Sequence, residues 1–161
     1  MIGKVGLALT SRSPRETIRL GARLGRLLLP GDIILLEGPI GAGKTVFAQG
    51  IARGLEVAEP VVSPSFTLVR EYVGRLALSH ADLYRLSPGA EVESIGLDDY
   101  LAADGVVVVE WAERAGDSLP GDCLLVQLRI IADNERRVRM APSGSRAADL
   151  LARFQRDGLE G

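Results

Sequence analysis

The stretch Gly38-Pro39-Ile40-Gly41-Ala42-Gly43-Lys44-Thr45 is the part of this sequence that decides its fold class. It matches the pattern G-x-x-x-x-G-K-[S/T] at every fixed position, after an apolar run and before a segment with helical character. Glycines let successive backbone N–H groups point at one anion, and the helix that begins there adds the positive end of its dipole. The motif predicts a phosphate-binding loop that holds ATP through Gly41, Ala42, Gly43, Lys44, Thr45 and Val46.

Apolar runs on either side of this loop predict the sheet. Asp32–Glu37 and Gly105–Trp111 are continuous runs of the kind found in strands that are buried on both faces. Four further segments are rich in strand-forming residues and predict two hairpins: Phe66–Tyr72 with Leu76–Tyr84, and residues 123–131 with 136–141. A short strand is expected at residues 4–10.

Helices are expected between these strands. Ser13 followed by Pro14 and Glu16 is typical of a helix start, and Pro30-Gly31 ends that helix. Others are expected from the loop to about Gly54, at 88–103 in two pieces broken near Gly96, and at 145–156. We predict an α/β fold like that of P-loop NTPases, with three layers, a mainly parallel central sheet, added antiparallel hairpin strands, and one domain over residues 1–161.

Composition narrows the class of protein. The chain has 161 residues, of which 47% are hydrophobic and 25% charged, so a globular domain is expected. No apolar stretch approaches the roughly 20 residues of a membrane helix, no signal peptide is apparent, and Cys123 is the single cysteine. The net charge of −2 lacks the basic excess of a DNA-binding protein. We expect a cytoplasmic protein that binds neither membrane nor DNA.

A magnesium–nucleotide site needs more than the loop. Lys44 is expected to reach the β- and γ-phosphates, and the Thr45 hydroxyl to ligate Mg²⁺. Glu110, at the end of the second apolar run, is the expected carboxylate for the metal; the alternative is a surface glutamate at a strand end. Asp82 is expected to hold the metal's water shell or to orient the attacking water, with a salt bridge to Arg85 as the competing interpretation.

Two further features of the sequence each allow two interpretations. His80, the only histidine, would share one face of a strand with Asp82, and it is either a packed strand residue or a catalytic one. The segment Ser63-Pro64-Ser65-Phe66-Thr67 follows the expected loop helix. Small NTPases often carry a mobile segment there that senses the γ-phosphate, so Ser63, Ser65 and Thr67 are switch-like candidates; a plain turn is the alternative.

Together, these motifs resemble the TsaE (YjeE) family, small bacterial P-loop ATPases of the pathway that makes threonylcarbamoyladenosine (t6A) in tRNA. The resemblance covers most of the chain, and only loosely the part after Ala112. Ser65 stands where the family usually has threonine, and serine keeps the hydroxyl group. The segments that carry the resemblance are GPIGAGKT at 38–45, SPSFTLV at 63–69, HADLYRL at 80–86 and VEW at 109–111.

The resemblance implies a function and partners. A TsaE-like protein does not transfer the threonylcarbamoyl group; it binds the complex of TsaD and TsaB, and its ATP hydrolysis permits repeated rounds of modification at position 37 of tRNA. It implies roles in catalysis and Mg²⁺ binding for Asp82 and Glu110, beside Lys44, and a switch-like role for residues 63–67. Contact with tRNA is expected only through the complex.

Two other functions stay open from the sequence. One is a small P-loop kinase, although the segment 116–120 is short for a lid that would exclude water from phosphoryl transfer. The other is a binding module with negligible turnover, in which ATP or ADP sets the affinity for a partner. A GTPase is disfavoured because the guanine-reading N-K-x-D pattern is absent.

Overall fold

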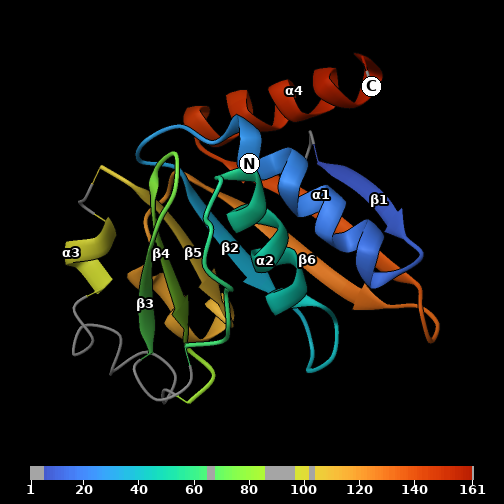
Figure 1. Cartoon of the computed structure of the whole chain (residues 1–161), viewed down its shortest axis with the longest axis horizontal. Helices are drawn as coiled ribbons and strands as arrows, with labels where there is room; N and C mark the ends of the chain where they lie inside the picture. The colour runs from blue at the N-terminus through green and yellow to red at the C-terminus, as the bar shows by residue number, and fades with distance from the viewer. Residues whose placement is uncertain (1–5, 65–67, 86–96, 102–103, 161) are drawn as a thin grey trace.

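Seven strands form one sheet in this computed structural model, which describes residues 6–64, 68–85, 97–101 and 104–160. Their order across the sheet is β1-β7-β6-β2-β5-β4-β3 (Figure 1). The strands are β1 (Leu7–Ser11), β2 (Ile33–Glu37), β3 (Val69–Val73), β4 (Ala77–Asp82), β5 (Val106–Glu110), β6 (Cys123–Ile130) and β7 (Arg136–Ser143).

Helices cover both faces of the sheet. One apolar core lies between the sheet and the three long helices, which are α1 (Pro14–Leu27), α2 (Lys44–Gly54) and α4 (Ser145–Glu160). A smaller core lies on the opposite face, beneath α3 (Leu97–Leu101) and the 3₁₀ helix η2 (Ala112–Ser118). The three layers and the α/β class predicted from the sequence are confirmed, with the second helical layer thinner than the first.

The four central strands are parallel and the outer ones antiparallel. β2 pairs in parallel with β5 and β6, and β4 pairs in parallel with β5. The hairpins β3–β4 and β6–β7 add antiparallel strands, and β1 joins the sheet beside β7. The prediction of a mainly parallel centre extended by two hairpins is therefore confirmed.

Some predicted boundaries were wrong. The first strand is β1, shifted toward Ser11 from the expected 4–10, because its ladder with β7 extends to Ser11 opposite Arg136. The last helix continues to Glu160 instead of ending at residue 156, and its added turn contacts α1 where Arg23 pairs with Asp157 at 3.2 Å. The 3₁₀ helix was not predicted. The expected helical piece at 88–96 lies outside the described residues.

Parallel pairing brings the functional segments to one edge of the sheet. Glu110 ends β5 opposite Leu36 of β2 on one side and Asp82 of β4 on the other. The loop 38–43 leaves the same end of β2 and leads into α2. Because parallel strands end together, residues that are distant in the sequence surround one loop.

Helices α1 and α2 approach closely through glycines on both. A Cβ built on Gly21 would lie 2.4 Å from the Phe47 carbonyl oxygen, and one on Gly50 would lie 2.4 Å from the Ile18 oxygen. Neither position has room for a methyl group, so the small residues set the distance between the helices. The start of α1 has the predicted cap: the Ser13 hydroxyl accepts the Glu16 N–H at 3.1 Å.

Candidate functional site: the loop between β2 and α2

The loop takes backbone conformations that favour glycine. Gly41 has φ 83° and Gly43, the N-cap of α2, has φ 101°, both in the left-handed region. Helix α2 therefore begins at Lys44 without a side-chain cap. The first N–H groups of a helix have no partner within the helix, so the N-terminus of α2 can bind an anion that lies over the loop.

Lys44 is folded back onto the loop. Its Nζ donates to the carbonyl oxygens of Gly38 at 2.5 Å and Pro39 at 2.9 Å, and lies 4.0 Å from the centroid of the Trp111 ring. Desolvation lowers the pKa of Lys44, and the negative charges of Glu110, Glu113 and Asp82 oppose that shift. The ammonium is thus held by weak neutral acceptors and an aromatic face, which phosphate oxygens can replace with a stronger charge-assisted bond.

Three hydrogen-bonded side chains, of which His80 and Glu110 are buried, lie beside Lys44. The Thr45 hydroxyl lies 2.9 Å from Oε1 and 3.1 Å from Oε2 of Glu110. Nε2 of His80 lies 2.6 Å from Oε2 of the same carboxylate. The His80 and Glu110 side chains are 1% and 3% exposed. Threonine and glutamate oxygens are ligands that Mg²⁺ prefers, so this pair fits a magnesium ion bound together with phosphates.

Asp82 connects the site to the segment after α2. Its Oδ2 accepts the hydroxyl of Ser63 at 3.0 Å, and its Oδ1 accepts the backbone N–H of Tyr84 at 2.9 Å. The Asp82 carboxylate also adds to the negative field at Lys44. This places Ser63 in contact with the wall of the site. The other switch-like candidates, Ser65 and Thr67, lie outside the described residues.

These residues line one open cavity of about 320 Å³. The structure thus brings together Lys44, Thr45, Asp82 and Glu110, which the sequence proposed as catalytic or metal-binding. Their roles stay predictions, and so do those of the loop residues Gly41, Ala42, Gly43 and Val46. The full lining is Ile40, Gly41, Gly43, Lys44, Thr45, Val46, Asp82, Glu110 and Trp111.

Trp111 closes one side of this cavity from a left-handed backbone conformation, with φ 57°. That conformation is costly for a bulky side chain and is found mainly where surrounding contacts impose it. Here the ring lies against Lys44 and 4.9 Å from the Tyr84 ring, measured between centroids. The sequence motifs did not indicate this contact between Trp111 and the loop lysine.

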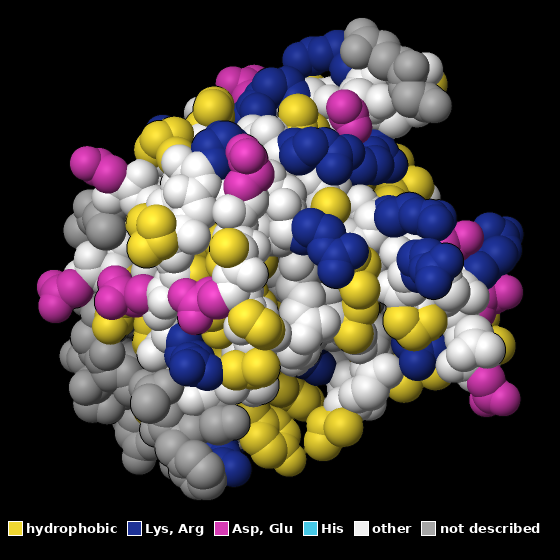
Figure 2. All heavy atoms as spheres, viewed as in Figure 1, with side chains coloured by type: hydrophobic (Ala, Val, Ile, Leu, Met, Phe, Trp, Pro, Cys, Tyr) yellow, Lys and Arg dark blue, Asp and Glu magenta, His cyan; other side chains and the backbone are white. Residues whose placement is uncertain are grey.

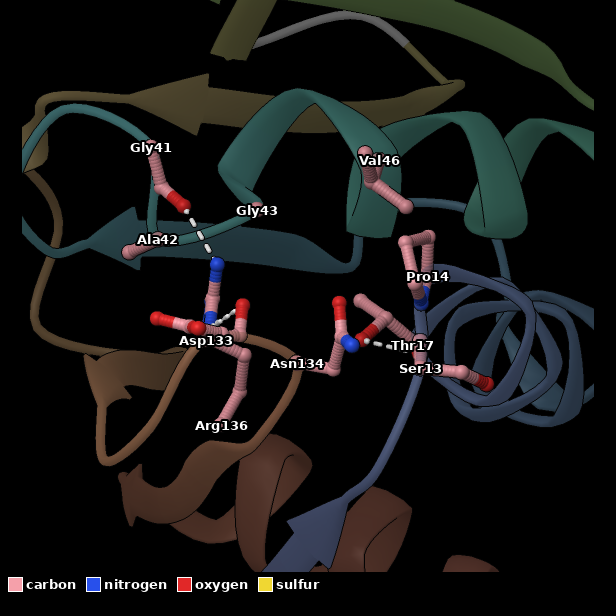
Figure 3. A pocket seen from close by; sticks show the side chains of 10 residues that line it. All are labelled: Ser13, Pro14, Thr17, Gly41, Ala42, Gly43, Val46, Asp133, Asn134 and Arg136. Atoms are coloured by element: carbon pink, nitrogen blue, oxygen red, sulfur yellow. Dashed lines mark hydrogen bonds between the residues drawn. The ribbon is translucent and has the colours of Figure 1, made fainter.

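A second cavity of about 130 Å³ lies on the other side of the loop (Figure 3). Gly41, Gly43 and Val46 line both cavities, so the two meet across the loop. The sequence did not locate a pocket for the nucleoside, and this cavity is the candidate. Its walls come from α1, the loop and the β6–β7 turn: Ser13, Pro14, Thr17, Gly41, Ala42, Gly43, Val46, Asp133, Asn134 and Arg136.

Arg136 ties the β6–β7 turn to the loop. Its guanidinium donates to the Gly41 carbonyl oxygen at 3.1 Å, and to the carbonyl oxygens of Ala132 and Asp133 within its own turn. Figure 3 shows Arg136 reaching across the cavity to Gly41. No role for Arg136 could be predicted from the sequence, because nothing local distinguishes a hairpin arginine that contacts the loop from a solvated one.

Surface charge is less even than the net charge of −2 implies. On the helical face, lysine and arginine side chains gather toward the upper and right part of the view in Figure 2. Arg15, Arg19 and Arg26 of α1 are exposed. Net charge alone did not reveal this local concentration.

Two features are absent from the described residues. No helix in that part of the chain is long and apolar enough to cross a membrane. No group of three or more His, Cys, Asp or Glu side chains, among the same residues, could hold a metal ion alone. A magnesium ion in the first cavity would therefore need oxygen ligands from phosphates or water as well as from Thr45 and Glu110.

The fold and the loop define an α/β protein of the P-loop type, with the glycine-rich loop between a central parallel strand and the helix that follows. The chain belongs to the TsaE family: residues 11–139 match the model of "Threonylcarbamoyl adenosine biosynthesis protein TsaE". The resemblance drawn from the sequence motifs is therefore confirmed.

Individual relatives agree with the family match. The chain is 42% identical over 131 residues to the tRNA threonylcarbamoyladenosine biosynthesis protein TsaE of Treponema pallidum, covering 81% of this chain and 97% of that protein. It is 38% identical over 145 residues to the protein of the same name from Bacillus subtilis, covering 89% and 90%. The crystal structure of Bacillus subtilis YdiB superposes with a TM-score of 0.85 at 32% identity, covering 98% of both chains.

Proposed function

We propose that this protein is a magnesium-dependent ATPase that serves tRNA t6A37 modification by binding the TsaD–TsaB complex and coupling ATP hydrolysis to its turnover. The observation that carries the proposal is the pairing of Thr45 with Glu110 beside Lys44 at the N-terminus of α2. That geometry suits the phosphates and magnesium of a bound nucleotide. The partners come from the family resemblance, and the tRNA contact is proposed to be made through them.

The polar side chains that line the first cavity each have a task in this proposal. Lys44 exchanges its carbonyl partners for phosphate oxygens, and the α2 N-terminus binds the same phosphates through its N–H groups. Thr45 and Glu110 would hold Mg²⁺, which when bound neutralises charge on the phosphates. Asp82 accepts hydrogen bonds at the edge of the cavity, where it can orient water.

The second cavity is proposed to hold the nucleoside. It shares Gly41, Gly43 and Val46 with the phosphate cavity, so the two lie next to each other, as one extended ligand requires. Asn134 carries an amide that can both donate and accept hydrogen bonds with a base, and Pro14 and Val46 supply apolar surface.

The experiment is phosphate release from ATP and Mg²⁺, measured for the chain alone and with purified TsaD and TsaB. We expect slow release that rises with the partners and is abolished by Lys44→Ala, which removes the ammonium from the phosphate site. Glu110→Ala should reduce Mg²⁺-dependent release more than it reduces nucleotide binding in EDTA. Glu71→Ala, on the exposed edge strand β3, is the matched carboxylate control.

Each contrary result points to a different function. Release that ignores TsaD and TsaB would refute the accessory role. Phosphate transfer to a small-molecule acceptor in place of water would favour the kinase. A binding module of negligible turnover would show no release, and a partner affinity that differs between ATP and ADP. The Ser63–Asp82 hydrogen bond gives that module a route from the nucleotide to the surface.

A further inference from the structure

His80 is the buried polar residue of this site that the proposed mechanism does not use. It lies on β4 with 0% of its surface exposed, and its Nε2 is 2.6 Å from Oε2 of Glu110. Its other ring nitrogen, Nδ1, is the one buried side-chain nitrogen or oxygen without a hydrogen-bond partner among the described residues. A core histidine kept only for packing gains nothing from this arrangement, because an unpartnered buried nitrogen costs about 1–3 kcal/mol.

The direction of the hydrogen bond follows from its partners. The Thr45 hydroxyl is within hydrogen-bond distance of both oxygens of Glu110, and a carboxylate accepts hydrogen bonds without donating any. Nε2 of His80 therefore carries a hydrogen and donates a hydrogen bond to Oε2, while Nδ1 is the nitrogen without a partner. Two donors, from β4 and from the first turn of α2, thus converge on one carboxylate at the end of β5.

Glu110 has a competing partner. The carboxylate lies close enough to Lys44 to act on its charge, and the ammonium is otherwise bound to neutral carbonyl oxygens. A glutamate free to rotate would gain by pairing with Lys44 directly. Such a pair would occupy both the group meant for the phosphates and the group meant for the metal.

We propose that His80 is a positioning residue: its Nε2–H holds the Glu110 carboxylate against Thr45 and away from Lys44, so that the protein's two magnesium ligands are in place before nucleotide binds. The inference rests on the proposed nucleotide function and deepens it. Partners that orient a metal ligand typically contribute about 10–100-fold to metal affinity or activity. His80 touches neither phosphate nor metal in this proposal.

Two substitutions separate positioning from packing. In His80→Gln, the side-chain amide nitrogen reaches the place of Nε2 and can still donate to Glu110. In His80→Asn, the amide reaches only the place of Nδ1, so the donor to Glu110 is lost while a buried amide remains. The readout is the ratio of nucleotide Kd in EDTA to that in Mg²⁺, with the Mg²⁺ concentration for half-maximal turnover measured beside it.

We expect His80→Asn to lose about 10-fold or more of the magnesium effect while nucleotide binding in EDTA changes little. His80→Gln should retain most of the effect. If the two folded variants lose it equally, or if neither loses it, the positioning role is refuted.

A second measurement is independent of nucleotide. His80 is the only histidine in the chain, so its ring nitrogens and ring N–H give one identifiable set of NMR signals. We expect the proton on Nε2, protected from exchange with water, and a marked shift of its signal in Glu110→Gln. A ring whose Nε2 carries no proton, or a ring signal that is indifferent to Glu110→Gln, would overturn the proposal even if His80→Asn fails to fold.

The two measurements also separate failure of the inference from failure of the proposed function. A wild-type chain that binds no nucleotide would refute the proposed function and, with it, the positioning role in magnesium binding. A chain that binds and hydrolyses ATP with an unaltered magnesium effect in His80→Asn would refute the inference alone.

Discussion

Replacing Gly50 of α2 by alanine should destabilise the fold, although alanine is the better helix former. The added Cβ would lie 2.4 Å from the Ile18 carbonyl oxygen and 3.0 Å from the Gly21 Cα. Both are backbone atoms, so no side chain can move aside. The two helices must separate until the first distance reaches at least about 3.0 Å, and every side chain packed between them loses contact.

The magnitude follows from two opposing effects. Overpacking of this kind costs roughly 1–3 kcal/mol, and the upper part of that range applies because only backbone can yield. Replacing a glycine in a helix interior by alanine stabilises the helix by about 1 kcal/mol. We expect a net loss of about 2 kcal/mol, or roughly 4–8 °C in Tm for a chain of this size.

Urea unfolding followed by circular dichroism measures this loss, and Gly158→Ala is the matched control. Gly158 is also helical, but its Cβ would meet the end of the flexible Arg23 side chain, which can move. That variant should stay within about 1 kcal/mol of the wild type. Adding Gly21→Ala to Gly50→Ala should cost less than the sum of the two, because both disrupt one contact. A Gly50→Ala protein as stable as the wild type would refute the reasoning.

Three other predictions concern separate parts of the molecule. Burial, together with the charge of Asp122, raises the pKa of the Cys123 thiol. The thiol should therefore react far more slowly in the native than in the unfolded protein at pH 8–9. The thiol's contribution to stability should be lost as pH rises from the usual thiol pKa toward the raised one, and Cys123→Ala should remove this pH dependence. Phe154→Ala should cost about 3–5 kcal/mol in urea unfolding, because the ring is 0% exposed in the main core; a loss below 1 kcal/mol would contradict that packing. Trp111 is the only tryptophan and lies 4.0 Å from the Lys44 ammonium, so Lys44→Met should change its emission without nucleotide and reduce the further change on adding ATP; identical spectra would count against the contact.

Much of the fold was readable from the sequence because its signals are local. The glycines of the loop, the cap at Ser13, and the apolar runs of β2 and β5 each depend on a few consecutive residues. The parallel centre and the hairpins followed from the same runs and turns. The errors were at boundaries, where tertiary pairing rather than propensity decides the last residue, as Ser11 and the end of α4 show.

The candidate site was readable only in part. The spacing of the glycine-rich motif identifies the lysine and the threonine, and a glutamate at the end of an apolar strand can be predicted as their partner. Nothing in the sequence states that His80 reaches that glutamate at 2.6 Å, or that Arg136 reaches the loop at 3.1 Å. Those contacts join segments 30 and 95 residues apart.

The sequence by itself determined the phosphate loop, the α/β class and the family, because each depends on short stretches of consecutive residues that need no distant contact to be recognised. Only the tertiary structure decided which groups meet across the loop: the donors on Glu110, the aromatic face under Lys44, and the second cavity beside Arg136. The physical reason is the order of strands in the sheet. Parallel pairing of β2, β5 and β4 brings their ends to one edge, and the β6–β7 turn reaches the same edge from the other side.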